Sequence, residues 1–291
     1  KYPSTVLLLV SNVCGGICRY CFRKRVFIQS DQEILHDLPA AVEYIRSHPE
    51  ITNVLLTGGD PLVLSTARLR EIIEAIMPVP HVRIIRLGSK IPAFDPARIL
   101  DDPELAALIR QACDRNKQIY VMTHFIHTRE LTAPARLAAQ YLHQAGALLA
   151  NQTPLIRGCN DDPLVLADLF RELSFAGIPP YYVFQCRPAS GNKPYAVPVE
   201  EGFRIFEKAK SLVSGLAKRA RFVMSHVSGK IEIVGLTQQN IFMKYHRAAE
   251  ESDSGDFLMF LRNPQAYWFD DYLAAVNWQK VDWHFDAYGP E

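Results

Sequence analysis

Near its start the chain reads Val6-Leu7-Leu8-Leu9-Val10-Ser11-Asn12-Val13-Cys14-Gly15-Gly16-Ile17-Cys18-Arg19-Tyr20-Cys21. Its first five residues form a continuous apolar run, which is typical of a buried strand in a parallel sheet. A loop with three closely spaced cysteines follows directly. This order predicts a chemically active loop at the carboxyl end of the first strand.

Apolar runs of strand length alternate with segments of helical period along most of the chain. This alternation predicts βαβ units and a parallel sheet. The predicted strands are Val6–Val10, Val54–Thr57, Val82–Leu87, Gln118–Thr123, Ala147–Gln152, Tyr181–Gln185 and Arg221–Ser225. The predicted helices are Leu38–Ser47, Ala67–Ile76, Pro103–Arg115, Ala133–Ala145, Pro163–Phe175 and Val199–Val213.

Polar side chains follow these strands at their carboxyl ends, which would bring them to one rim. They are Ser11-Asn12, Gly58-Gly59-Asp60, Gly88-Ser89-Lys90, His124, Asn151-Gln152, Arg187 and Ser225-His226. Active sites of α/β barrels assemble at that rim. We therefore expect an α/β fold with a partial or complete (β/α) barrel over residues 1–235. A doubly wound open sheet also fits the alternation.

After about Leu236 the alternation stops. Residues 236–291 mix aromatic and acidic residues, as in Phe257–Asp271, Trp278, Trp283 and Phe285. We predict a C-terminal extension that packs on the barrel or on a partner subunit, with a homo-oligomer as one possibility.

Composition sets broad limits on the kind of protein. The chain has 291 residues, 48% hydrophobic and 22% charged, which is ordinary for a globular protein. Its net charge of +1 gives no electrostatic reason to expect nucleic acid. No apolar run approaches the roughly 20 residues that span a membrane. No signal peptide is visible, although the chain begins at Lys1, so we expect a cytoplasmic protein.

The spacing CxxxCxxC predicts a metal site at Cys14, Cys18 and Cys21. Soft thiolate ligands suit zinc or an iron–sulfur cluster. A structural zinc ion takes four ligands, and no second cysteine pair follows. Three thiolates instead leave one iron of a [4Fe–4S] cluster open to an outside ligand, so we favour the cluster.

This spacing after the first strand resembles the radical S-adenosylmethionine (SAM) superfamily. The turn Thr57-Gly58-Gly59-Asp60-Pro61 resembles that superfamily's methionine-binding motif, in which glycines expose backbone groups to the cofactor's amino group. The resemblance implies that SAM chelates the open iron. One electron from the cluster, delivered by a donor such as flavodoxin or ferredoxin, would then cleave SAM to a 5′-deoxyadenosyl radical.

Longer stretches across residues 1–235 resemble one subgroup, the lysine 2,3-aminomutase family. They are Lys1-Tyr2-Pro3, Cys18–Arg25, Arg86–Pro92, Thr123-His124-Phe125, Asn151–Asp161 and Pro180–Cys186. The resemblance implies that His124, Asn151 and Gln152 lie at the cofactor. It also implies pyridoxal phosphate, which holds the amino group that migrates, and assigns Lys230 in Ser228-Gly229-Lys230-Ile231 to that coenzyme.

The chain departs from the family pattern around the coenzyme. The glycine run before Lys230 is shorter, and Thr5 stands where a basic residue near the coenzyme phosphate is expected. Phe184 replaces a tyrosine, and Tyr20 replaces a histidine between the last two cysteines. A coenzyme-independent radical rearrangement, epimerisation or modification of another carboxylate substrate therefore stays open. A non-enzymatic iron–sulfur or zinc protein is a further alternative, against which the Gly58-Gly59 turn argues.

Two arginines bear on the substrate, which we expect to be a small molecule of the amino-acid class. Arg23 matches the family arginine that grips the substrate α-carboxylate, for which a guanidinium has the right bidentate geometry. The resemblance implies that lysine enzymes use two aspartates to hold the substrate's terminal ammonium. At the first of these positions this chain has Arg187, and near the second it has the uncharged Ser225. Because an arginine would repel that ammonium, we predict a glutamate-like substrate that contacts Arg187.

Overall fold

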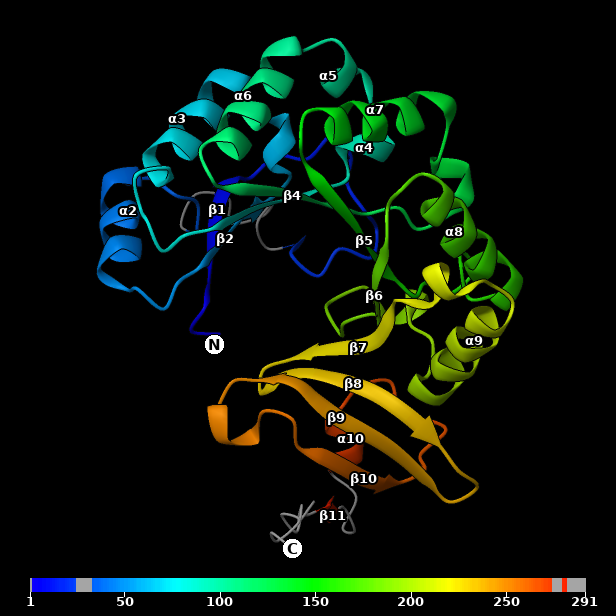
Figure 1. Ribbon diagram of the computed structural model, residues 1–291. Helices are drawn as coiled ribbons and strands as arrows, with labels where there is room; N and C mark the ends of the chain where they lie inside the picture. The colour runs from blue at the N-terminus through cyan, green and yellow to red at the C-terminus, as the bar shows by residue number, and fades with distance from the viewer. Residues whose placement is uncertain (1, 25–32, 274–278, 282–291) are drawn as a thin grey trace, which may run out of the picture.

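The computed structural model of the chain describes residues 2–24, 33–273 and 279–281 (Figure 1). Of the last three residues it describes the backbone alone. The predicted features at Lys1, Arg25, Trp278, Trp283 and Phe285 lie outside the described residues.

A single mixed sheet of 11 strands, hydrogen-bonded in sequence order, organises the described residues. Its parallel strands are β1 (Thr5–Ser11), β2 (Asn53–Gly58), β3 (Ile84–Ser89), β4 (Gln118–Thr123), β5 (Leu148–Pro154), β6 (Pro180–Phe184) and β7 (Arg221–His226). The antiparallel continuation is β8 (Gly229–Leu236), β9 (Asn240–Ala248), β10 (Phe257–Leu261) and β11 (Gln279–Val281). Among the described strands β1 pairs with β2 alone, so the barrel is partial.

Helices cover the convex outer face of the parallel strands (Figure 1). The longer ones are α2 (Leu38–Ser47), α3 (Thr66–Ile76), α6 (Pro103–Asp114), α7 (Ala133–Gln144), α8 (Pro163–Phe175) and α9 (Val199–Ser211). The short ones include α4 (Ile91–Phe94), α5 (Ala97–Leu100) and α10 (Asp270–Leu273). None of the described helices combines the length and apolar character needed to cross a bilayer.

Local sequence starts these helices where they are needed. Asp102, Thr132 and Asp162 each accept a hydrogen bond from a backbone N–H of the first turn, and a proline stands within the first two positions of each helix. The capping side chain accepts from a backbone N–H group that has no partner within the helix. Proline has no backbone N–H group, so at this position it leaves none without a partner. The local sequence therefore fixes the residue at which each of these three helices begins.

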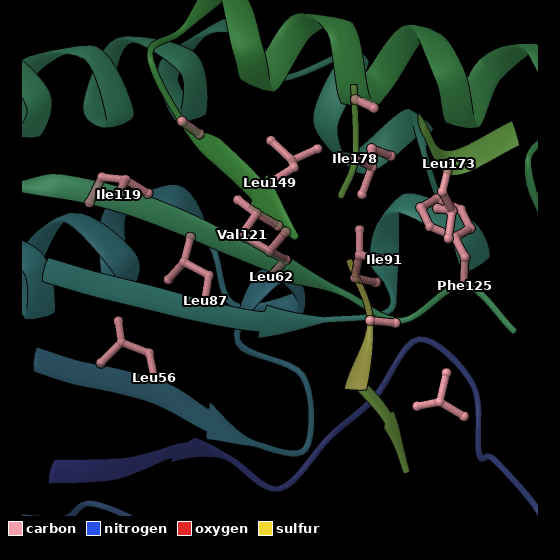
Figure 2. Packing of buried hydrophobic residues seen from close by; sticks show 14 of the residues in the cluster. Leu56, Leu62, Leu87, Ile91, Ile119, Val121, Phe125, Leu149, Leu173 and Ile178 are labelled. Carbon is pink, nitrogen blue, oxygen red and sulfur yellow. The ribbon is translucent and has the colours of Figure 1, made fainter. Parts of the chain in front are cut away.

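The hydrophobic core lies between the sheet and this helical layer (Figure 2). On successive strands Leu56, Leu87 and Val121 are fully buried and point toward the helices. Neighbouring positions point to the concave face, since strand side chains alternate. A doubly wound sheet would bury both faces under helices, so the one-sided layer excludes that alternative.

The predicted fold class is confirmed. Each of the seven predicted parallel strands overlaps an observed strand, and each of the six predicted helices overlaps an observed helix. Boundaries differ by a few residues, as for the strand expected at Val82–Leu87 and found at Ile84–Ser89. These ends depend on hydrogen-bond partners in neighbouring strands, which apolar runs do not specify.

The antiparallel strands were not among the predictions. A two-residue turn, Val227-Ser228, reverses the chain after β7, and β8 pairs back along it from the match of His226 with Gly229. The sheet runs without a break through the boundary expected near residue 235, which lies inside β8. The division into two domains stays a prediction.

The described part of the extension packs against the barrel through a buried carboxylate. Glu200 on α9 is 1% exposed and accepts hydrogen bonds from Arg262 Nε at 2.9 Å and from the Asn263 backbone N–H at 2.8 Å. Phe260, Phe269 and Tyr272 are buried nearby in the same core. A charged group at such depth is tolerated because its partners neutralise it.

Replacing Glu200 should loosen this attachment. We expect Glu200→Ala to lower the free energy of unfolding by about 2–4 kcal/mol, because Arg262 would lose its partner inside the protein. Glu207→Ala on the same helix removes an exposed ion pair with Lys210 and should change stability by less than about 0.5 kcal/mol. Urea unfolding measures the free energy of unfolding of both variants. An equal loss in the two variants would contradict the role of Glu200 in attaching the extension.

Candidate active site

Two loops meet at the carboxyl ends of β1 and β2: the cysteine loop (residues 12–24) and the glycine turn (residues 57–61). The backbone N–H of Gly59 donates to Ser11 O at 2.6 Å, and that of Asp60 donates to Val13 O at 2.7 Å. These bonds fix the cysteine loop against the turn. The predicted contact with a cofactor's amino group therefore falls to the carbonyl groups of the turn, since both N–H groups are used.

The approach is so close that only glycine fits the turn. Gly58 has φ +123°, and a Cβ there would lie 2.3 Å from Ser11 O. A Cβ on Gly59 would lie 2.1 Å from Val13 O. Because backbone atoms on both sides are tied by hydrogen bonds, neither clash can relax cheaply.

The three cysteines are half-buried and carry free thiols. Burial, followed by Asp60 and the other two thiols, raises the pKa of Cys14 to about 12. No three His, Cys, Asp or Glu side chains in the described parts of the chain converge on a point as ligands of one ion. A four-iron cluster takes its thiolates at separate corners, so three soft donors spread along one loop fit that group.

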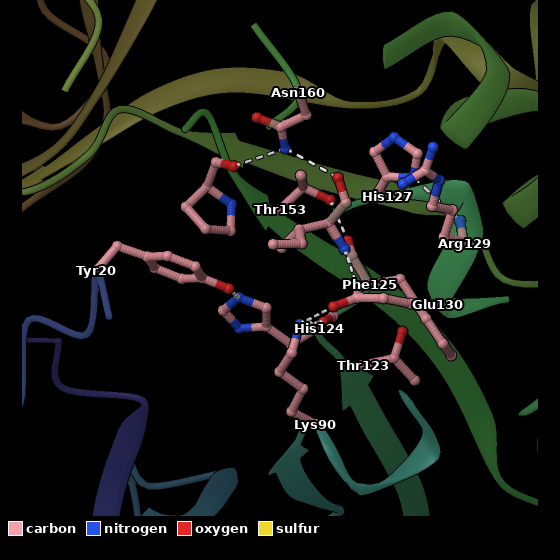
Figure 3. Close-up of polar contacts among 12 residues, drawn as sticks. Tyr20, Lys90, Thr123, His124, Phe125, His127, Arg129, Glu130, Thr153 and Asn160 are labelled. Atoms are coloured by element: carbon pink, nitrogen blue, oxygen red, sulfur yellow. Dashed lines mark hydrogen bonds and ion pairs between the residues drawn. The ribbon is translucent and has the colours of Figure 1, made fainter. Parts of the chain in front are cut away.

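Tyr20, between the second and third cysteines, faces His124 at the end of β4 (Figure 3). The Tyr20 hydroxyl and His124 Nε2 are 3.3 Å apart, and the rings stack with centroids 6.0 Å apart. Burial, together with Lys90, holds the pKa of His124 well below its usual range, so the ring is neutral at neutral pH. The structure thus brings the predicted residue His124 to the cysteine loop.

Lys90 supports this arrangement from the end of β3. Its Nζ donates to His124 O at 2.8 Å and to Glu130 Oε1 at 2.7 Å, while Glu130 Oε2 accepts from the Ile126 N–H at 2.7 Å. The pair is largely buried, and Figure 3 shows it beside Tyr20 and His124. The segment after β4 is therefore held in one position relative to the end of β3.

Asn151 is 1% exposed and hydrogen-bonds within the protein. Its Nδ2 donates to Phe125 O and Thr153 Oγ1, and its Oδ1 accepts from Phe125 N–H and Thr123 Oγ1, all within 2.7–2.9 Å. It therefore fixes the segment that carries His124. The half-buried Gln152 pairs in register with Tyr182 on the concave face. Contact of either residue with a cofactor stays a prediction.

The two arginines expected at the substrate meet on one aromatic ring. Arg23 Cζ lies 5.3 Å and Arg187 Cζ 5.5 Å from the centroid of Phe22. Arg23 Nη1 also donates to Thr57 Oγ1 at 2.7 Å and to Gly58 O at 3.2 Å. The guanidinium of Arg23 is thereby oriented beside the glycine turn.

A buried asparagine ties the loop that carries Arg187 to the cysteine loop. Asn192 Nδ2 donates to Tyr20 O at 2.9 Å and to Arg187 O at 3.3 Å, and its Oδ1 accepts from Lys24 Nζ at 2.7 Å. Sequence reasoning missed Asn192, the Tyr20–His124 contact and the Lys90–Glu130 pair. No spacing signal links them, because they come from loops far apart in the chain.

Lys230 lies near the start of β8, opposite Ser225 of β7 and Arg247 of β9. Its Nζ is 3.9 Å from the centroid of the Tyr182 ring and 5.2 Å from that of Phe184. The side chain is half-buried on the concave face. A primary amine in this setting, lined by flat aromatic rings, fits an aldehyde coenzyme such as pyridoxal phosphate.

A partial (β/α) barrel with three cysteines on its first loop is the arrangement expected of a radical SAM protein. Comparison with solved structures agrees on the fold. A structure described as "Native anSMEcpe with bound AdoMet and Kp18Cys peptide" superposes with a TM-score of 0.52 at 13% identity, over 72% of this chain and 58% of that one. No family profile matches the chain.

Sequence relatives narrow the class to one family. A protein of Aquifex aeolicus named "Putative L-lysine 2,3-aminomutase" is 53% identical over 95% of this chain and 74% of its own length. The L-lysine 2,3-aminomutase of Fusobacterium nucleatum is 36% identical over 88% of this chain and 59% of its own length. The glutamate 2,3-aminomutase of Clostridioides difficile is 34% identical over 75% of this chain and 50% of its own length. The chain belongs to the lysine 2,3-aminomutase family, and spans about half to three quarters of these relatives' lengths.

Adding one methyl group to the glycine turn should separate it from the cysteine loop. We expect Gly59→Ala to lose most of the bound iron and the absorbance near roughly 400 nm after anaerobic reconstitution, because its Cβ collides with Val13 O. Gly215→Ala, where a Cβ meets nothing within 4 Å, should retain both. Full iron content in Gly59→Ala would show that the contact is not required.

Proposed function

We propose that this chain catalyses a radical 2,3-amino migration on an amino acid whose side chain bears a carboxylate, glutamate being the simplest. The proposal rests on one observation: the guanidinium groups of Arg23 and Arg187 both lie against the ring of Phe22. Relatives are named for lysine and for glutamate, so similarity alone does not choose between the two substrates. The choice rests on charge.

Arg23 is suited to bind the α-carboxylate. Its hydrogen bonds to Thr57 Oγ1 and Gly58 O fix the plane of the guanidinium beside the glycine turn. A fixed planar donor binds a carboxylate with little further loss of side-chain entropy. The substrate's reacting carbons would then lie near the cysteine loop, where a radical would be formed.

Arg187 is suited to bind the side-chain carboxylate. It is exposed, and it forms no ion pair with a carboxylate of the described residues. This favours a substrate role over a structural one. A lysine substrate would instead bring an ammonium toward the guanidinium, which costs free energy in a partly desolvated site.

The cluster, SAM and pyridoxal phosphate would each find fitting residues. Cys14, Cys18 and Cys21 would hold the cluster, the glycine turn would contact SAM, and Lys230 would hold the coenzyme. Together these groups supply a hydrogen-abstracting radical and a carrier for the migrating nitrogen. The chain's own residues bind and orient the substrate and exclude water, with Tyr20 and neutral His124 closing one side of the site.

Substrate choice is tested by anaerobic incubation with SAM, dithionite and single amino acids, followed by mass spectrometry for β-isomers. Glutamate should be converted faster than lysine. Arg187→Ala should lower kcat/KM for glutamate by about 10–100-fold through loss of a charge-assisted hydrogen bond. Arg115→Ala, at an exposed position beyond α6, is the control. Lysine turnover equal to that of glutamate would contradict the substrate assignment.

The coenzyme is tested separately by borohydride reduction in the presence of pyridoxal phosphate. Peptide mapping should find the adduct on Lys230 and none in Lys230→Ala, whereas Lys208→Ala on the exposed face of α9 should label normally. Absence of an adduct on Lys230, with SAM cleavage intact, would favour radical chemistry without the coenzyme.

A further inference from the structure

Basic side chains gather on the concave face beside Lys230. Arg247 stands directly opposite Lys230 in the pairing of β8 with β9, so both side chains lie on the same face. The register shift after this pair adds an extra residue, His246, to β9. Burial and the charges of Arg221, Lys230, Lys244 and Arg247 lower the pKa of His246 to about 4.

Arg247 reaches from β9 to the residues that precede β1. Its Nη2 donates to Ser4 Oγ at 3.1 Å, and its Cζ lies 4.2 Å from the centroid of the Tyr2 ring. These contacts come from a hydroxyl and an aromatic ring, so they orient the guanidinium without neutralising it. The sheet curves far enough to bring β9 to the start of β1.

Arg86 on β3 is connected to the same region through β2. Its Nε donates to Asn53 Oδ1 at 2.8 Å, again a neutral partner. Burial lowers the pKa of Arg86, and among its titratable neighbours Tyr181 and Tyr182 raise this pKa while Arg247 lowers it. Asn53 pairs with Thr5, the residue after the Ser4 that Arg247 contacts, so both guanidinium groups lie near the start of β1. Two half-buried cations in one place repel unless an anion lies between them.

The protein's own carboxylates do not balance these charges. Glu232 pairs with Arg221 at 3.2 Å, and Arg221 also donates to His246 Nδ1 at 2.7 Å. Neither Arg86 nor Arg247 forms an ion pair with a carboxylate in the described ranges. The concave face therefore carries an excess of positive charge, with two arginines set for an external anion.

We propose that Arg86 and Arg247 form an anion subsite beside Lys230 that binds the phosphate of a phosphate monoester. A dianion with several acceptor oxygens matches two guanidinium groups better than a single carboxylate does. Lys230, in register with Arg247, lies where an aldehyde on the same ligand would reach its amine. The inference rests on the proposed coenzyme and explains the uncharged Thr5, because Arg247 brings a positive charge to the neighbouring Ser4.

The test compares pyridoxal phosphate with pyridoxal, which lacks the phosphate, by absorbance titration of the full chain. Arg247→Gln and Arg86→Gln should each raise Kd for pyridoxal phosphate by about 10–100-fold and leave Kd for pyridoxal within about threefold. Inorganic phosphate should compete with pyridoxal phosphate and not with pyridoxal. Ser4→Ala, which removes the Arg247 contact and keeps the charge, should bind both nearly as the parent does.

Other results separate this inference from the proposed function. Borohydride labelling of Lys230 with unchanged Kd in Arg247→Gln and Arg86→Gln would overturn the subsite and leave the coenzyme assignment intact. Arginine-dependent binding of inorganic phosphate without any adduct on Lys230 would support an anion subsite for a free phosphate and count against the coenzyme. Equal losses for pyridoxal and pyridoxal phosphate in the variants would overturn the subsite.

Discussion

Two backbone hydrogen bonds, from the N–H groups of Gly59 and Asp60 to the carbonyls of Ser11 and Val13, hold the site together. They join loops that follow adjacent parallel strands. They form only because Gly58 and Gly59 carry no Cβ that would collide with the backbone of the cysteine loop. The cysteine loop then has one position relative to β2. Tyr20 can reach His124 and Arg23 can reach Thr57 from that position, so the rest of the site depends on this contact.

The curved sheet separates two kinds of binding surface. Its convex face is covered by helices (Figure 1) and supplies the hydrophobic core. Its concave face and rim carry the charged side chains of the two proposed binding surfaces. Arg23 and Arg187 lie at the rim beside the cysteines, and Arg86, Lys230 and Arg247 lie along the concave face. An anionic substrate and an anionic coenzyme would thus bind neighbouring positive surfaces without competing for the same arginines.

The parallel strands were predictable because each is an apolar run bounded by turn residues, and an amphipathic helix follows all of them except β7. The strand β8 was not, since alternating residues such as Lys230, Ile231 and Glu232 pair only because a two-residue turn reverses the chain. The cysteines and the glycine turn are local motifs, so sequence found them. Asn192 and Glu130 act across loops distant in the chain, and Arg247 becomes relevant only when the sheet curves back to Ser4.

The central claim is that three cysteines hold a cluster whose open iron binds SAM beside the glycine turn. The most direct test is the electron paramagnetic resonance spectrum of the anaerobically reduced protein, recorded before and after addition of SAM. The account predicts the signal of a reduced four-iron cluster that changes shape when SAM is added, because SAM ligates one iron. A spectrum without a cluster signal, or one that SAM leaves unchanged, would contradict it.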